Sequence, residues 1–183
     1  MAKRSIPSNV PDRNSRVDIV RDREVGREAV AVDDLRLEDR ARIEQLTIAY
    51  AYAVDEKDWG AFEALYVPDA TIDYRSAGGI VGTPAEVAAW MAGASEMFSW
   101  STHSMSTQRI VFTGPAAATG SMHVFARYGL VWQDAEELLD VSAVYHDAYV
   151  RTASGWLFAS RREQTNAVTG GRFADLVRTT LPR

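Results

Sequence analysis

The second half of the chain is a succession of long β-type segments with very short breaks between them. The breaks fall at Gly114-Pro115, from Asp134 to Glu137, and at Ser154-Gly155. The strands expected between these breaks cover about residues 101–113, 117–132, 140–152 and 156–164. Strands joined by such short connections pair antiparallel, so this half of the chain predicts one large, mostly antiparallel sheet.

Helical periodicity is found in the first half instead. Apolar residues recur at helical spacing at Ile43, Leu46 and Tyr50, which predicts a helix over about residues 36–54. Helices therefore come first and the sheet follows, and this order is typical of the α+β class. A curved sheet wrapped around a long first helix forms a cone-shaped α+β barrel. The cavity inside such a cone is a usual place for a small-molecule site.

Two shorter helices and a strand are expected between the long helix and the sheet. Asp58 is suited to cap the first of these helices. Residues 70–75 have the pattern of a strand. Thr83 and Glu86 have the spacing of a capping box, which predicts a helix that reaches about Phe98.

Composition divides the chain into three regions. Residues 1–34 contain seven basic and seven acidic residues and few large apolar ones, so we expect a flexible charged arm there. Residues 35–165 form the predicted folded domain, and residues 166–183 form a C-terminal tail.

The overall composition excludes several classes of protein. The net charge of −5 argues against a nucleic-acid-binding surface. Cysteine is absent, which excludes disulfides and thiolate metal sites and fits a reducing compartment. No apolar run approaches the roughly 20 residues that are needed to cross a bilayer. We therefore expect a cytoplasmic protein without nucleic-acid or membrane partners.

Strand alternation indicates which side chains share a face of the sheet. If the chain turns symmetrically about residues 114–117, His103 lies opposite Tyr128 and both side chains point to one face, whereas His123 points to the other. One β-bulge would reverse this assignment for part of the strand. His103 with Tyr128 is therefore the first choice for the cavity, and His123 is the alternative.

A carboxylate and several phenols accompany this histidine. Asp55 lies where the first helix ends, and Tyr50 and Tyr74 flank it in the sequence. Tyr50 and Asp55 both reach the cavity only if the helix ends or bends between them. Tyr145 belongs to a set of tyrosines that suit either an aromatic pocket or the core. A carboxylate, a histidine and phenols are the minimum equipment for moving protons on an organic substrate without a cofactor.

Metal binding is not expected from the same residues. The candidate ligands are three histidines and Asp147, but His146 and Asp147 are neighbours on a strand and point to opposite faces. No pair of histidines has the spacing of a metal site. We expect neither a metal nor an organic cofactor.

Several motifs together resemble the SnoaL-like branch of the nuclear transport factor 2-like superfamily. They are LYVPDATIDY at residues 65–74, Thr102-His103, and YVR at residues 149–151 followed by Gly155-Trp156. The resemblance covers about residues 36–165 and implies the cone-shaped fold. This fold hosts dehydratases, isomerases, polyketide cyclases, dioxygenase small subunits and binding modules, so it does not by itself settle the activity.

Within this branch the sequence is most similar to scytalone dehydratase and bile acid 7α-dehydratase. The resemblance implies that Asp55 and His103 form the catalytic pair, that Tyr74 polarises the substrate, and that Tyr50 joins the site. The residues expected to contact the substrate differ from those of scytalone dehydratase, because Tyr128 stands where that enzyme has a second histidine. The substrate is therefore expected to differ as well.

These observations predict a cofactor-independent dehydratase that acts on a cyclic, polyketide-like or steroid-like β-hydroxy carbonyl compound. His103 would remove the proton next to the carbonyl, and a phenol would stabilise the resulting enolate. A polyketide cyclase or a ketosteroid-type isomerase begins with the same proton transfer and is an alternative. A non-catalytic module that binds small hydrophobic or aromatic molecules is the other alternative.

The sequence also predicts self-association. Sheets in this fold usually carry an outer apolar face that another subunit covers. The assumed register places Ile110, Phe112, Phe125 and Val131 on that face. We expect a homo-oligomer, and the resemblance favours a trimer over a dimer.

Overall fold

The computed structural model describes residues 36–132, 134–171 and 174–175. The predicted arm of residues 1–34 and most of the predicted tail lie outside the described residues. The helices are α1 (Leu37–Asp55), α2 (Trp59–Ala64) and α3 (Pro84–Ala94), with 3-10 turns η2 (Arg75–Ala77) and η3 (Ser95–Met97). The strands are β1 (Tyr66–Asp73), β2 (Val81–Gly82), β3 (Phe98–Gly114), β4 (Ala117–Trp132), β5 (Ala135–Thr152) and β6 (Gly155–Gly170).

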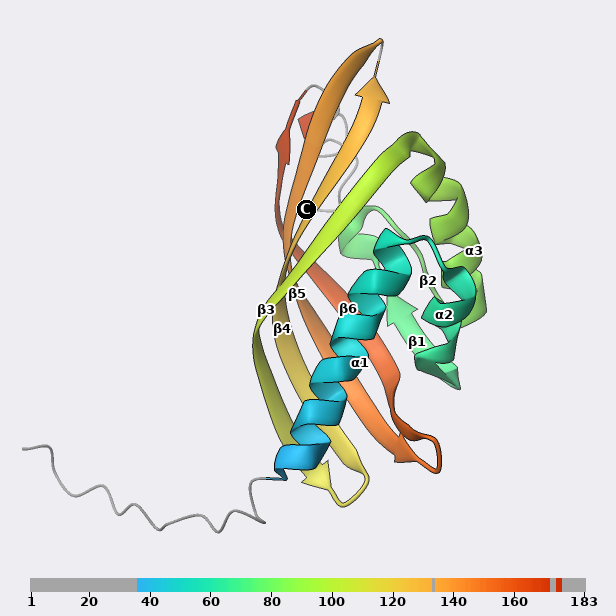
Figure 1. Cartoon of the computed structure of the whole chain (residues 1–183), viewed down its shortest axis with the longest axis vertical. Helices are drawn as coiled ribbons and strands as arrows, with labels where there is room; N and C mark the ends of the chain where they lie inside the picture. The colour runs from blue at the N-terminus through green and yellow to red at the C-terminus, as the bar shows by residue number, and fades with distance from the viewer. Residues whose placement is uncertain (1–35, 133, 172–173, 176–183) are drawn as a thin grey trace, which may run out of the picture. The chain divides into compact units, whose positions relative to one another are not determined.

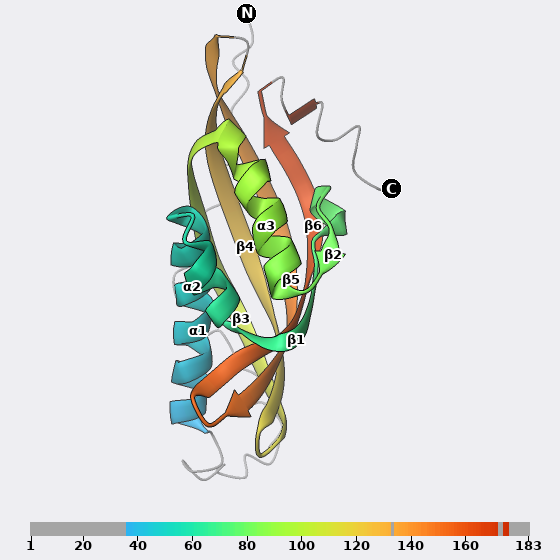
Figure 2. The same ribbon diagram turned by 90° about the vertical axis from the view of Figure 1, so that its right-hand side faces the viewer.

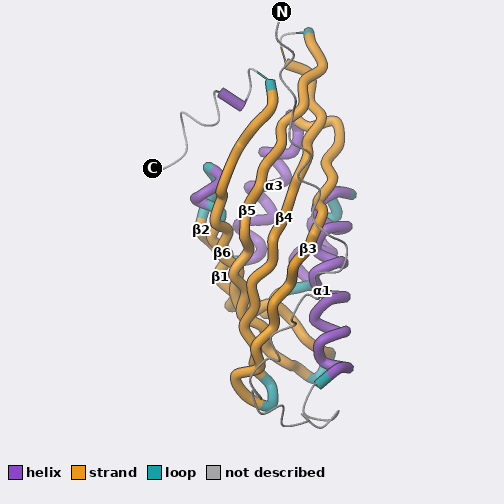
Figure 3. The backbone as a smooth tube through the Cα atoms, turned by 90° about the vertical axis from the view of Figure 1, so that its left-hand side faces the viewer, coloured by secondary structure: helices purple, strands orange, loops and turns teal. Residues whose placement is uncertain are grey.

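The strands form one mixed six-stranded sheet in the order β2-β1-β6-β5-β4-β3. Strands β3, β4, β5 and β6 pair antiparallel with one another in that succession, and β1 runs parallel to β6. Helices α1, α2 and α3 lie on the same side of the curved sheet (Figures 1 and 2). Among the described residues no helix covers the other side (Figure 3). The predicted α+β class and the curved sheet around a long first helix are confirmed.

Local sequence rules account for where the short helices begin. The Asp58 carboxylate accepts a hydrogen bond of 2.9 Å from the backbone of Ala61, as expected of a cap. Thr83 and Glu86 form the predicted capping box, with Pro84 in the first turn of α3. Helix α3 ends earlier than predicted, because η3 intervenes before β3.

The β3–β4 register differs from the symmetric hairpin and corrects part of the predicted outer face. His103 pairs with Ala126, not Tyr128, and the pairing shifts again near Thr107, whose φ of 50° marks a bulge. The bulge reverses the side-chain alternation in the last part of β3. Ile110 and Phe112 therefore point inward and pack with the core, which makes their predicted outer position wrong.

The first part of β3 keeps the predicted alternation. A register change of two residues leaves every side chain on the same face, so His103 and Tyr128 still share the inner face. Phe125 and Val131 are exposed, as predicted.

Strand β6 continues beyond the predicted end of the domain. Residues 166–170 belong to the predicted tail, yet Val168 and Gly170 pair with Val141 and Leu139 of β5. Val168 is buried in a small second core with Leu139 and Leu130. The described helices include none that is long and apolar enough to cross a membrane.

Candidate active site

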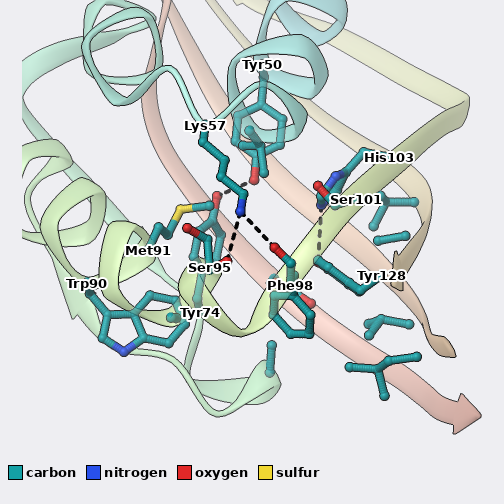
Figure 4. Close-up of a pocket in the computed structure, with 18 of the residues that line it drawn as sticks. Tyr50, Lys57, Tyr74, Trp90, Met91, Ser95, Phe98, Ser101, His103 and Tyr128 are labelled. Atoms are coloured by element: carbon teal, nitrogen blue, oxygen red, sulfur yellow. Dashed lines mark hydrogen bonds between the residues drawn. The ribbon is translucent and has the colours of Figure 1, made fainter. Parts of the chain in front are cut away.

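A cavity of about 250 Å³ lies between the C-terminal end of α1, helix α3 with η3, and the inner face of the sheet. Figure 4 shows Tyr50, His103 and Tyr128 around the same space. Apolar lining residues include Val54, Trp59, Trp90, Met91, Phe98 and Leu139. Lys57 at the rim donates hydrogen bonds of 3.0 and 2.8 Å to the backbone oxygens of Ser95 and Phe98, which ties the end of α1 to the start of β3.

His103 lines one side of this cavity and is paired with Asp55. Asp55 is the last residue of α1, and His103 lies on β3. The Asp55 Oδ1 atom lies 2.6 Å from Nδ1 of His103, and Oδ2 accepts a hydrogen bond of 2.9 Å from the His103 backbone amide. Ser101 donates a further hydrogen bond of 2.8 Å to Oδ1. Three hydrogen bonds therefore fix the carboxylate relative to the ring.

These contacts keep Asp55 ionised and define the tautomer of His103. Burial alone would raise the pKa of Asp55, but the hydrogen bonds from His103 and Ser101 outweigh it and hold the pKa below its usual range. An ionised carboxylate only accepts hydrogen bonds, so Nδ1 carries the proton and donates it. In the neutral ring Nε2 then has a free lone pair. Tyr128, whose hydroxyl lies 3.3 Å from Nε2, donates to it.

Three phenols meet on the cavity wall next to this pair. The hydroxyls of Tyr50 and Tyr74 share a hydrogen bond of 2.8 Å, and those of Tyr50 and Tyr145 are 3.4 Å apart. All three side chains are buried, which raises their phenol pKa values above the ordinary range. They therefore remain protonated near neutral pH and can act as hydrogen-bond donors.

A buried cation, Arg161, lies against the aromatic rings of two of these phenols. The Arg161 guanidinium lies 4.0 Å from the ring centre of Tyr50 and 4.3 Å from that of Tyr145. It donates two hydrogen bonds of 2.8 Å to Asp147, which also accepts one of 2.9 Å from Tyr149. The Arg161 and Asp147 side chains have no exposed surface. This ion pair holds the cation in place beneath the rings.

The structure brings most of the predicted site residues together. Asp55 and His103 are in direct contact, and Tyr50, Tyr74, Tyr128 and Tyr145 line the same cavity. His123 does not belong to this group, because it is exposed on the outer face of β4. Helix α1 includes both Tyr50 and Asp55 and does not end between them, so only Tyr50 lines the cavity, and Asp55 acts on it through its contact with His103.

Sequence reasoning missed four residues of the site. Strand alternation places Ser101, two positions before His103, on the same face as the ring, but a serine on that face gave no sign that it binds Asp55. Lys57, Arg161 and Glu163 carry charges, and charged residues are expected at the surface in the absence of a known partner. No three metal-ligating side chains gather in the part of the chain that the structure describes.

The sequence and its fold can be compared with known proteins. Residues 35–162 match the SnoaL-like domain. The chain belongs to the SnoaL-like domain family. An uncharacterized protein of Mycobacterium tuberculosis is 30% identical over 128 residues, which cover 69% of this chain and 85% of the relative.

Solved structures share the fold of this SnoaL-like chain. The Kfla4162 protein of Kribbella flavida has a TM-score of 0.69 and 26% identity over 78% of this chain and 98% of its own. LinA, a hexachlorocyclohexane dehydrochlorinase, has a TM-score of 0.66 and 27% identity over 76% and 94% of the two chains. A candidate scytalone dehydratase of Novosphingobium aromaticivorans has a TM-score of 0.66 and 22% identity over 75% and 90%. These similarities confirm the predicted superfamily.

Proposed function

We propose that this SnoaL-like protein is a cofactor-independent dehydratase of a cyclic β-hydroxy carbonyl compound. The observation that carries the proposal is the orientation of His103. Its Nδ1 atom is held by Asp55 at 2.6 Å, so Nε2 carries the basic lone pair at the wall of an apolar cavity, where it accepts a hydrogen bond of 3.3 Å from Tyr128 until substrate replaces that contact. A histidine oriented in this way is suited to remove a proton from carbon.

The reaction begins with transfer of the proton next to the substrate carbonyl to Nε2 of His103. Asp55 stabilises the imidazolium that forms, since the two groups are already hydrogen-bonded. Negative charge then develops on the carbonyl oxygen. The neutral phenols of Tyr50, Tyr74 and Tyr145 are donors that can stabilise it, and such donors contribute about 10²–10³-fold to the rate. The bond from carbon to the β-hydroxyl then breaks, and the hydroxyl takes up a proton from an acidic group of the site and leaves as water.

The cavity favours a small ring compound over a large one. Its volume of about 250 Å³ is slightly below the roughly 300–1,000 Å³ of pockets for drug-sized ligands. Tyr74 and Tyr145 stack with their ring centres 6.3 Å apart and present an aromatic wall. One or two rings with a polar carbonyl fit these properties better than a four-ring steroid does.

The comparisons support an elimination. Two of the structural neighbours carry the names dehydrochlorinase and dehydratase, which describe removal of hydrogen chloride or of water. A cyclase or an isomerase would use the same first step and differ only in the fate of the enolate. A binding module without catalysis has no need of a histidine held by a carboxylate.

Hydrogen–deuterium exchange monitored by NMR tests the proposal. A panel of cyclic and aromatic β-hydroxy ketones in D₂O should show exchange next to the carbonyl, or loss of water, with the wild-type protein. Both should fall to the uncatalysed background with His103→Ala. The matched control is His123→Ala, which removes an exposed histidine from the outer face and should leave the rates unchanged.

The products separate the alternatives in the same experiment. An enone indicates dehydration, a shifted double bond indicates isomerisation, and a new carbon–carbon bond indicates cyclisation. If ligands bind but none exchanges, the protein is a binding module and the enzyme proposal is wrong.

We also propose that copies of the chain associate through the outer face of the sheet, as a trimer with a dimer as the alternative. Phe125 is 44% exposed and Val111 50% exposed on this face. Light scattering coupled to size-exclusion chromatography should give an oligomer that Phe125→Asp dissociates. Tyr52→Asp is the control, because Tyr52 is 63% exposed on α1. A wild-type monomer at micromolar concentration would contradict the proposal.

A further inference from the structure

A carboxyl group other than Asp55 lines the cavity and has no part in the proton abstraction by His103. Glu163 lies on β6 and is only 9% exposed. It points to the inner face together with Arg161, and Tyr145 lies directly across from it on β5. Strands β5 and β4 separate β6 from β3, so Glu163 approaches the cavity from a different side than His103 does.

The two oxygens of the Glu163 carboxyl have different surroundings. Oε1 accepts a hydrogen bond of 3.1 Å from the hydroxyl of Thr165. The Thr165 hydroxyl also lies 3.3 Å from the hydroxyl of Ser76. Among the described residues Oε2 has no hydrogen-bond partner, and it is not one of the fully enclosed atoms. One oxygen of this cavity-lining side chain is therefore anchored, and the other has no protein partner among the described residues.

Glu163 forms no ion pair among the described residues, although the Arg161 charge acts on it. Arg161 is the nearest cation on its own strand, but both of its hydrogen bonds go to Asp147. The neighbours on the other elements are phenols, all of them neutral: Tyr145 on β5, Tyr128 on β4, Tyr50 on α1, and Tyr74 after β1. His103 and Lys57 also line the cavity, and their side chains already contact Asp55 and two backbone oxygens.

Burial in these surroundings raises the pKa of Glu163 to about 7, although the Thr165 hydrogen bond and Arg161 act in the opposite direction. Asp55 contacts His103 at the wall of this cavity and has its pKa lowered by its hydrogen bonds. When one carboxyl group of a site has a raised pKa and another has a lowered pKa, the first typically acts as a general acid and the second stays ionised and stabilises charge. At neutral pH a large share of Glu163 still carries its proton.

We propose that Glu163 is the general acid that protonates the departing hydroxyl, opposite His103 as the general base. The strand pairing places Glu163 level with Met122 on β4, whereas His103 is level with Ala126, so the two residues are separated both across the sheet and along it. Both side chains line the same cavity, and a small ring substrate in that cavity would lie between them. This inference rests on the proposed dehydratase function and adds a role for a residue on the far strand.

The proposed step balances in protons and electrons. His103 Nε2 takes the proton from the carbon next to the carbonyl, and that C–H electron pair becomes the new double bond. The C–O bond breaks towards the hydroxyl oxygen, which takes the proton of the Glu163 carboxyl and leaves as water. After this step His103 is an imidazolium and Glu163 is a carboxylate. Loss of a proton from His103 to solvent and uptake of one by Glu163 restore the starting state.

The leaving group provides the sharpest test. Glu163→Gln keeps the size and the hydrogen bond of the side chain but cannot transfer a proton. Loss of water from a β-hydroxy ketone should slow by about 10²–10⁴-fold, the usual range for one general acid. Loss of chloride from the matched β-chloro ketone should change less than about threefold, because chloride leaves without a proton. Exchange next to the carbonyl should persist.

The pH dependence gives a second readout. Dehydration by the wild-type protein should decline as the pH rises through about 7, where Glu163 loses its proton, and elimination of chloride should lack this decline. The Glu163→Gln variant should lack it for both substrates. A melting curve for the variant at pH 7 controls for folding.

Each outcome has a separate meaning. If Glu163→Gln slows water and chloride loss equally, or neither, the general-acid role is wrong while the dehydratase proposal stands. If the wild-type protein neither exchanges protons nor eliminates either leaving group, the proposed function itself is wrong, and the role of Glu163 falls with it.

Discussion

Replacing Asp55 by Asn should lower kcat for the elimination by about 10³–10⁴-fold, close to the effect of the same change in hydrolases that use a His–Asp pair. The carboxylate accepts the Nδ1 proton of His103 at 2.6 Å. An amide can instead donate to Nδ1, which moves the ring proton to Nε2 and removes the lone pair that faces the cavity. The nearest matched control is Asp58→Asn, because asparagine caps a helix as well as aspartate does.

The tautomer can be measured without any substrate. Nitrogen-15 NMR of the wild-type protein at pH 8 should show a protonated Nδ1 and an unprotonated Nε2 for His103. The Asp55→Asn variant should show the reverse. A variant that retains the wild-type tautomer, or that keeps activity within tenfold, would contradict the role given to this carboxylate.

Much of the fold can be predicted from local sequence patterns. The long β-type segments, the capping residues Asp58 and Thr83, and the apolar periodicity of α1 each act over a few residues, so a single sequence reveals them. The pairing registers of the strands depend on residues that are far apart in the sequence. The Thr107 bulge has no glycine or asparagine to mark it, and a β-branched residue at positive φ is unexpected. The predicted face of Ile110 and Phe112 is wrong for that reason.

The same contrast between local and long-range information applies to the candidate site. The predicted common face of His103 and Tyr128 is correct because a register change of two residues preserves the face. The burial of Arg161 and Glu163 could not be foreseen, because it depends on partners from other parts of the sequence. Arg161 is tolerated inside only because Asp147 on the neighbouring strand neutralises it. A sequence pattern within one strand does not contain this information.

Replacing Asp147 by Ala should lower the free energy of unfolding by about 3–5 kcal/mol, because the Arg161 guanidinium would remain buried without its carboxylate. Urea unfolding at pH 7 measures the change. The control is Asp140→Ala, which breaks a pair whose Arg127 side chain is 46% exposed and should cost about 0–1 kcal/mol. Equal losses in the two variants would contradict the buried character of the Arg161–Asp147 pair.

A double variant separates the structural role of this pair from its role in the site. Replacing Asp147 by Leu and Arg161 by Met removes both charges and should recover most of the lost stability, since apolar replacements of buried ion pairs are often neutral or stabilising. The double variant would still lack the cation that lies 4.0 Å from the Tyr50 ring. Its turnover should therefore stay below that of the wild-type protein while its melting curve is normal. Full turnover in a stable double variant would show that Arg161 has only a structural role and that the phenols act without it.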